Sequence, residues 1–176
     1  MFKTSSANWN CADGGMSTGV GFCQTDNHGL TWHVESSLLG TPKHSSVAHQ
    51  LNNEFNPTAL IVTFTSNPSY SGGSETDIIY QRGTSGLFGG DAITWCNDAV
   101  STLRCDQHYI RFRTTAYSQS LSCHESGHAV GLTHPGDANP PKPDNHASFY
   151  CMRVPAVDQG LGTDGTLTSQ INATYS

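Results

Sequence analysis

Three histidines and a glutamate, His124, Glu125, His128 and His134, stand within a stretch of eleven residues. On a helix, His124 and His128 would lie four residues apart on one face, so both imidazoles can bind one cation at about 2.0 to 2.1 Å. Gly131 permits a positive φ, which lets the chain leave the helix and return His134 to the same ion as a third ligand. Three imidazoles with a fourth position open to water describe a catalytic zinc site.

Glu125 directly follows a predicted ligand, so its side chain does not lie squarely on the helix face that carries the two histidines. Its carboxylate can still reach water at the open position. We expect Glu125 to act as a general base that takes the proton of this water during attack on a peptide carbonyl and passes it to the leaving amine. The alternative is a capping box between Ser122 and Glu125, which would leave His134 unexplained. The predicted chemistry is hydrolysis of peptide bonds.

The segment from His124 to His134 matches the pattern HExxHxxGxxH, and Met152 follows it within Tyr150-Cys151-Met152-Arg153. These residues resemble the metzincin clan of zinc metallopeptidases, in which a methionine turn packs beneath the metal. The resemblance implies that place for Met152. It also implies a twisted five-stranded mixed sheet with backing helices, an active-site helix and a C-terminal helix. One catalytic domain, 1–176, would comprise an upper subdomain of about 1–131 and a lower one of about 132–176.

By the same resemblance, an extended substrate would pair with an edge strand of the sheet, for which the candidate residues are Ala92, Ile93 and Thr94. Arg153, Val154 and Pro155, which follow the methionine, would help to shape the pocket for the side chain after the cleaved bond. The partner implied is a protein or peptide substrate, and we expect the protein to be a monomer.

Features beside the motif resemble different subfamilies. A cysteine directly before the His-Glu pair and another before Met152 look like small secreted peptidases of the matrixin or snapalysin type. The run His134-Pro135-Gly136-Asp137 looks like serralysins, but no tyrosine follows Met152 and the calcium-binding Gly/Asp repeats are absent. Snapalysins carry an aspartate where this chain has His134. The resemblance therefore indicates the clan and not a subfamily.

The six cysteines form three pairs that are close in sequence: Cys11 with Cys23, Cys96 with Cys105, and Cys123 with Cys151. We expect three disulfides, each contributing about 3 kcal/mol, and hence a secreted, extracellular protein. Free or metal-binding thiols are the alternative, but no C-x-x-C pair occurs. The first residues carry no apolar segment of a signal peptide, so we expect the sequence to represent a mature domain.

Composition limits the classes of partner. The chain has 176 residues, of which 35% are hydrophobic and only 12% are charged, and its net charge is -6. This length fits a single domain. The acidic balance disfavours binding to nucleic acid or to an anionic membrane surface. The longest apolar run, residues 59–62, is much shorter than the roughly 18 residues that a membrane helix needs.

Three segments are predicted as helices: residues 45–55, 118–132 and a short closing helix over 167–175. Four segments are predicted as strands: residues 59–65, 77–81, 92–95 and 109–113. The first strand is expected to be buried, and the last to be half-exposed because apolar and basic residues alternate in it. Residues 1–30 and 135–144 are expected to be irregular. Strands mixed with three helices predict an α/β or α+β domain.

Calcium is a second candidate cofactor, because Asp137 and Asp144 flank a proline-rich loop, although hydrogen bonds that stabilise the loop are the favoured alternative. Two rival functions use the same zinc site. One is a zinc-bearing module that binds a peptide or partner without turnover, and the other is a zinc amidase that acts on cell-wall peptide. Glu125 argues against the first, since a site without turnover has no need of a base.

Overall fold

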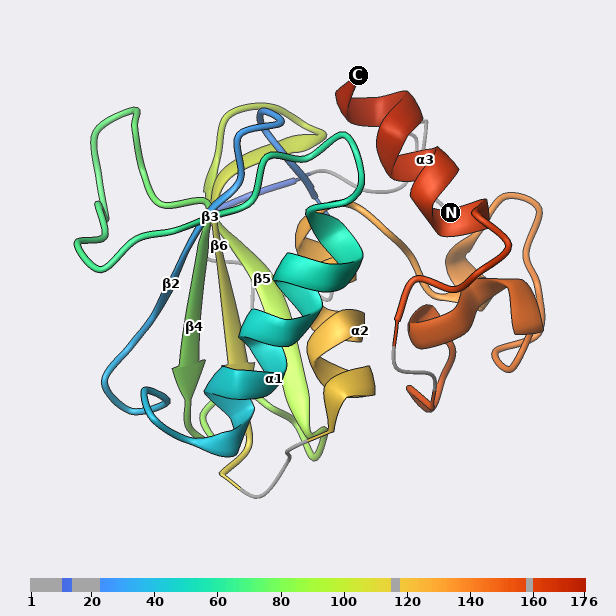
Figure 1. Ribbon diagram of the computed structural model, residues 1–176, viewed down its shortest axis with the longest axis horizontal. Helices are drawn as coiled ribbons and strands as arrows, with labels where there is room; N and C mark the ends of the chain where they lie inside the picture. Colours follow the sequence, from blue (N-terminus) through green and yellow to red (C-terminus); the bar gives the residue numbers. More distant parts are fainter. Residues whose placement is uncertain (1–10, 14–22, 115–117, 158–159) are drawn as a thin grey trace.

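The protein folds into a mixed sheet with helices packed against it (Figure 1). This computed structural model describes residues 11–13, 23–114, 118–157 and 160–176. The sheet strands are β1 (Gln24–Thr25), β2 (Thr31–Val34), β3 (Thr63–Phe64), β4 (Ile78–Arg82), β5 (Ala92–Ala99) and β6 (Arg104–Phe112). The helical elements are α1 (Pro42–Gln50), η2 (Leu51–Phe55), α2 (Gln119–Ala129), η3 (Pro135–Asp137), η4 (Ala147–Met152) and α3 (Thr166–Tyr175). The predicted α/β class is confirmed.

The sheet is parallel except for β5. β2, β4 and β6 pair in parallel, and the short strands β1 and β3 add to β6 and β2 in the same sense. β5 runs antiparallel to β6. Residues 108–112 of β6 pair with both β4 and β5, so these two strands lie on opposite sides of β6. Among the described residues β5 is therefore an edge strand, as expected for the segment that includes Ala92, Ile93 and Thr94.

Several strand predictions were wrong. Within the described residues the sheet has six strands and not five, and β1 forms within a segment that was expected to be irregular. β2 was not predicted at all. Residues 59–65 were expected to form a buried strand, but only Thr63 and Phe64 are in β3 and both are exposed, because this strand pairs with β2 alone at the opposite edge of the sheet.

The helices agree better than the strands with what the spacing of apolar residues predicts. Thr41 caps α1 by accepting a hydrogen bond from the N–H of His44, and Pro42 occupies the first turn, where its missing N–H costs nothing. Val47 of α1 and Leu51 and Phe55 of η2 are fully buried, so the predicted stripe faces the core. The last turn widens to π-helical geometry, which the apolar pattern does not reveal.

One apolar cluster connects the sheet and the C-terminal region. Tyr80 and Phe112 of the sheet belong to the same buried cluster as Met152 of η4 and Leu167 and Ile171 of α3. In Figure 1, α3 and the segment before it lie beside the sheet and its helices rather than on top of them. No helix within the described ranges is long and apolar enough to cross a membrane.

The three predicted disulfides are present. Cys11–Cys23 and Cys96–Cys105 lie in a second small cluster near β5 and β6, and Cys96–Cys105 links these two strands directly. Cys123–Cys151 links α2 to η4. The third disulfide therefore ties the helix that carries two predicted ligands to the segment that carries Met152.

Lys43 is a charged residue that the sequence analysis did not single out, and it is fully buried. Its ammonium donates hydrogen bonds to the backbone O of Ser118 (3.2 Å) and to the Ser122 hydroxyl (3.5 Å), and lies 4.3 Å from the centre of the Phe112 ring. Burial lowers the pKa of Lys43 to about 8, although the negative charge of Glu125 partly opposes this.

We predict that stability rises with pH between about 8 and 10. In this interval the unfolded chain, with a lysine pKa of 10.5, binds more protons than the folded protein, so raising the pH favours folding. Urea unfolding at a series of pH values measures the effect. Lys43→Met should abolish the rise, whereas Lys142→Met, a change at a partly exposed lysine, should retain it. A flat profile for the unmodified protein would contradict the prediction.

Candidate metal centre

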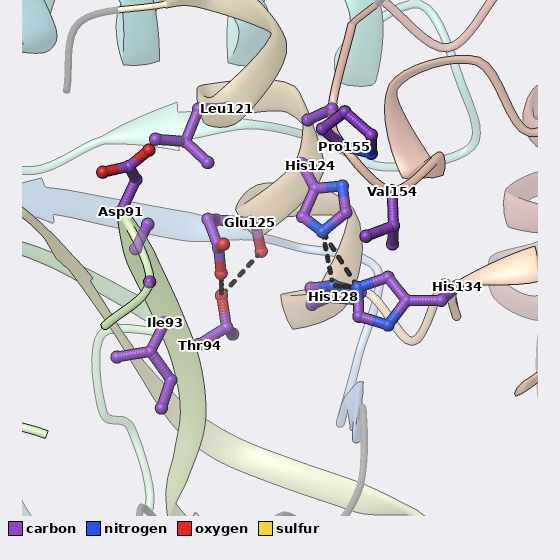
Figure 2. Close-up of a pocket in the computed structure, with 13 residues that line it drawn as sticks. Asp91, Ile93, Thr94, Leu121, His124, Glu125, His128, His134, Val154 and Pro155 are labelled. Atoms are coloured by element: carbon purple, nitrogen blue, oxygen red, sulfur yellow. Dashed lines mark hydrogen bonds between the residues drawn. The ribbon is translucent and has the colours of Figure 1, made fainter. Parts of the chain in front are cut away.

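α2 and the turn after it bring the three histidines of the motif together (Figure 2). His124 and His128 are one helical turn apart and both are buried. Gly131 has a φ of 94°, a left-handed conformation in which a side chain would be strained. The helix ends at Ala129, close to the predicted boundary, and the turn at Gly131 directs the chain so that His134 comes back to the other two rings.

The Nε2 atoms of the three rings converge. The distance from His124 Nε2 to His134 Nε2 is 3.0 Å, and each of these atoms lies 3.1 Å from His128 Nε2. Two nitrogens bound to one ion at about 2.0 Å in tetrahedral geometry would lie about 3.3 Å apart. The observed triangle is close to that value, so this His124–His128–His134 group could hold a metal ion.

Oxygen acceptors face the other nitrogen of each ring. His124 Nδ1 lies 2.7 Å from the backbone O of Cys151, and His128 Nδ1 lies 2.8 Å from the backbone O of Leu132. His134 Nδ1 lies 3.4 Å from a carboxylate oxygen of Asp137. A carbonyl or carboxylate requires a proton on the facing nitrogen, so Nε2 of each ring is left without a proton and could bind a metal.

The surroundings favour neutral imidazoles. Burial is the main cause that lowers the pKa of His128 well below its usual value, and the neighbouring rings of His124 and His134 lower it further. Burial and the ring of His124 also lower the pKa of His134, against the opposing charge of Asp137. Neutral rings are the form that binds a metal.

Glu125 lies beside the imidazoles, on the side facing β5. Its side chain is 5% exposed, and the Thr94 hydroxyl donates a hydrogen bond to Oε2 (2.6 Å), while also lying 3.0 Å from the backbone O of Glu125. Burial raises the pKa of Glu125, an effect that the charge of His124 and the Thr94 hydrogen bond oppose. Figure 2 shows Glu125 next to Thr94, with the three rings to one side of them.

Met152 is fully buried and packs against α2. A Cβ at Gly127 would overlap the sulfur of Met152, so only glycine allows this close approach. Tyr150, two residues before Met152, has a φ of 43°, which is uncommon for a residue with a side chain. Met152 thus packs on the helix that bears His124 and His128.

A cavity of about 500 Å³ opens beside the three imidazoles. Of the six predicted substrate-binding residues, five line it: Ala92, Ile93, Thr94, Val154 and Pro155. Arg153 does not, and its Nε instead donates to the backbone O of Tyr150 (3.3 Å).

Other lining residues were missed by the sequence analysis. They include Leu121 and Ala156. Leu121 could have been found, because it stands three residues before His124 on the same helix and so shares its face. Nothing local in the sequence distinguishes Ala156.

The calcium prediction at Asp137 and Asp144 receives no direct test. The carboxylate of Asp137 faces the ring of His134, and the backbone O of Asp144 accepts a hydrogen bond from the N–H of Val154 (3.0 Å). Cys11, Cys23 and Cys96 bring three sulfur atoms close together, but all three belong to disulfides and are not available as thiolate ligands.

No family model matches the chain, and a search of curated proteins finds no match either. A function for this chain therefore rests on the chemistry of its own residues.

We predict that Asp137→Asn weakens zinc binding about tenfold, because the ring of His134 loses the charged acceptor that faces Nδ1. Competition with a chromophoric chelator for Zn²⁺ measures this affinity. Asp144→Asn is the matched control, since it removes the same charge from the same loop without taking the acceptor from Nδ1. Equal affinities of the two variants would show that the Asp137 carboxylate has no such role.

Proposed function

We propose that the protein is a secreted zinc-dependent endopeptidase of the metzincin type. The observation that carries this proposal is the convergence of three Nε2 atoms next to a buried glutamate, in a cavity bordered by an edge strand. The motif and Met152 supply independent support, because the resemblance to metzincins implies these same positions.

His124, His128 and His134 would hold the metal. Three neutral nitrogen donors are a set that zinc accepts readily, and a catalytic zinc site commonly has three protein ligands. When bound in such a site, zinc supplies Lewis acidity and lowers the pKa of a coordinated water toward about 7. The acceptors at the three Nδ1 atoms orient the rings and keep each proton away from Nε2.

Glu125 would move the proton. Thr94 holds one carboxylate oxygen, which limits rotation of the carboxylate and keeps it beside the imidazoles. Burial makes Glu125 a stronger base than an exposed carboxylate, because its raised pKa increases its affinity for a proton. Glu125 would accept the proton of the attacking water and then donate it to the amine of the cleaved peptide bond.

The cavity suits an extended peptide. β5 pairs with β6 on one side, and its start borders the cavity on the other, so substrate backbone could add there as a further strand. Leu121, Val154 and Pro155 give the cavity an apolar wall that favours an apolar substrate side chain. The volume of about 500 Å³ is within the usual range for sites that bind small ligands.

The proposed location outside the cell is supported by the disulfides. The three disulfides are compatible with an oxidising compartment, where such bonds persist. Cell-wall peptide remains an alternative substrate for the same chemistry, and a profile of cleaved peptides separates it from general proteolysis.

We predict that Glu125→Gln retains zinc and loses at least about 100-fold in kcat/KM on a quenched fluorescent peptide library, because the amide cannot accept the proton. Glu35→Gln is the control, since Glu35 lies outside the cavity lining and the substitution makes the same change in charge. Zinc content is measured for each variant by elemental analysis. A zinc chelator should stop cleavage by the unmodified protein, and added Zn²⁺ should restore it.

Two results would contradict this function. One is wild-type turnover by Glu125→Gln, which would exclude the glutamate as the base. The other is zinc-dependent binding of peptides with no cleavage of any of them, which would favour the binding module without turnover.

A further inference from the structure

A second cavity, of about 430 Å³, lies at the other end of the parallel strands and shares no residue with the first. It is formed by residues from the β1–β2 connection, the loop between β3 and β4, and β6. Each of its lining residues other than two glycines carries a side-chain oxygen, and four are acids: Asp26, Glu75, Asp77 and Asp106. Neither basic nor apolar side chains line it.

Glu75 has a buried oxygen without a protein partner. The residue is 8% exposed, and within the described part of the chain its Oε2 is buried with no hydrogen bond. A buried carboxylate oxygen without a donor costs free energy unless a cation or another donor compensates it. Glu75 also lines the cavity, so a small movement of its side chain would bring this oxygen to a ligand held there.

Asp77 plays a different part, since both of its oxygens are occupied. Oδ1 accepts from the Thr25 hydroxyl (3.1 Å), and Oδ2 accepts from the Thr31 N–H (2.7 Å) and hydroxyl (2.5 Å). Asp77 therefore joins β1, β2 and β4 and contributes negative charge at the cavity without needing to contact a ligand.

The negative charge of the cavity is not neutralised by the protein groups described. Neither ion pair found among the described residues involves any of the four acids. Arg104 is nearby, but its guanidinium donates to the backbone O of Asp26 and not to a carboxylate. Burial, followed by the neighbouring acids, raises the pKa of both Glu75 and Asp106, and Asp98 contributes to both shifts.

We propose that this cavity binds Ca²⁺, with Glu75 as the buried ligand and Asp26 and Asp106 as further carboxylate ligands. Calcium is a hard cation that takes six to eight oxygens, including hydroxyl, carbonyl and water oxygens, in flexible geometry. A cavity lined only by oxygen-bearing residues and glycines matches this preference. Zinc would select nitrogen or sulfur donors, and magnesium requires a tighter octahedral arrangement.

The carboxylates line the cavity walls without meeting at one point, which sets them apart from the three imidazoles. Mutual repulsion accounts for this, and a cation would draw them together while water and loop carbonyls complete its shell. Binding would fasten the loop over residues 65–77 to the β1–β2 connection and to β6. The inference does not depend on the proposed function, because the cavity is separate from the imidazoles.

The test uses the full chain, stripped of metal by a chelating resin and reloaded with one equivalent of Zn²⁺. Calorimetric titration with CaCl₂ should show one binding site, and millimolar CaCl₂ should raise the Tm more than MgCl₂ does. Hydrogen exchange in residues 65–77 should slow when Ca²⁺ is present. Glu75→Gln should weaken Ca²⁺ binding about tenfold or more, whereas Glu35→Gln should leave it unchanged.

Asp106→Asn provides a second variant at the cavity, and circular dichroism checks that each variant is folded. Absence of binding heat and of any Tm change in CaCl₂ would overturn the proposal. Equal Ca²⁺ affinity of Glu75→Gln, Asp106→Asn and the unmodified protein would also overturn it, because the ion would then bind elsewhere.

Discussion

The direction in which three imidazole rings point is the constraint on which the proposed site depends. Each ring is fixed through its Nδ1 atom, by the backbone O of Cys151, the backbone O of Leu132 or the carboxylate of Asp137. These acceptors come from three places: η4, the turn after α2, and η3. The three Nε2 atoms converge only while all three segments keep their positions, so the metal centre is a property of tertiary packing and not of the motif alone.

α2 is held in place by bonds to both the sheet and the C-terminal helix. The Tyr80 hydroxyl of β4 lies 2.8 Å from the Ser126 hydroxyl, in the middle of α2. Just after the C-terminal end of α2, the Tyr175 hydroxyl of α3 donates to the backbone O of Val130 (3.0 Å). The Cys123–Cys151 disulfide adds a covalent link to η4. Such fixation on several sides supports a site whose ligands must stay within tenths of an ångström of one geometry.

The sequence predicted best what depends on local spacing. Four-residue spacing located the buried faces of α1 and α3, and the HExxHxxGxxH pattern located the helix, the turn at Gly131 and the three rings. It predicted poorly what depends on partners far along the chain. β3 is exposed because none of the described strands covers its outer side, and the apolar composition of residues 59–65 cannot show this. The burial of Lys43 and the oxygen-lined cavity were missed for the same reason. The surroundings of Lys43 and the walls of the cavity are both built from segments that are distant in sequence.

In the part of the chain that the structure describes, buried charge is found at a few places with different chemistry. The chain has few charged residues, so a buried ionisable group is an exception that needs a local cause. Lys43 and Glu125 are buried near α2, and the attraction between their opposite charges partly offsets the cost of burying both. At the second cavity the buried charges have one sign, so attraction between protein groups cannot offset their burial there. The same physical cost is thus partly met within the protein at one place, and at the other the proposed cation would meet it.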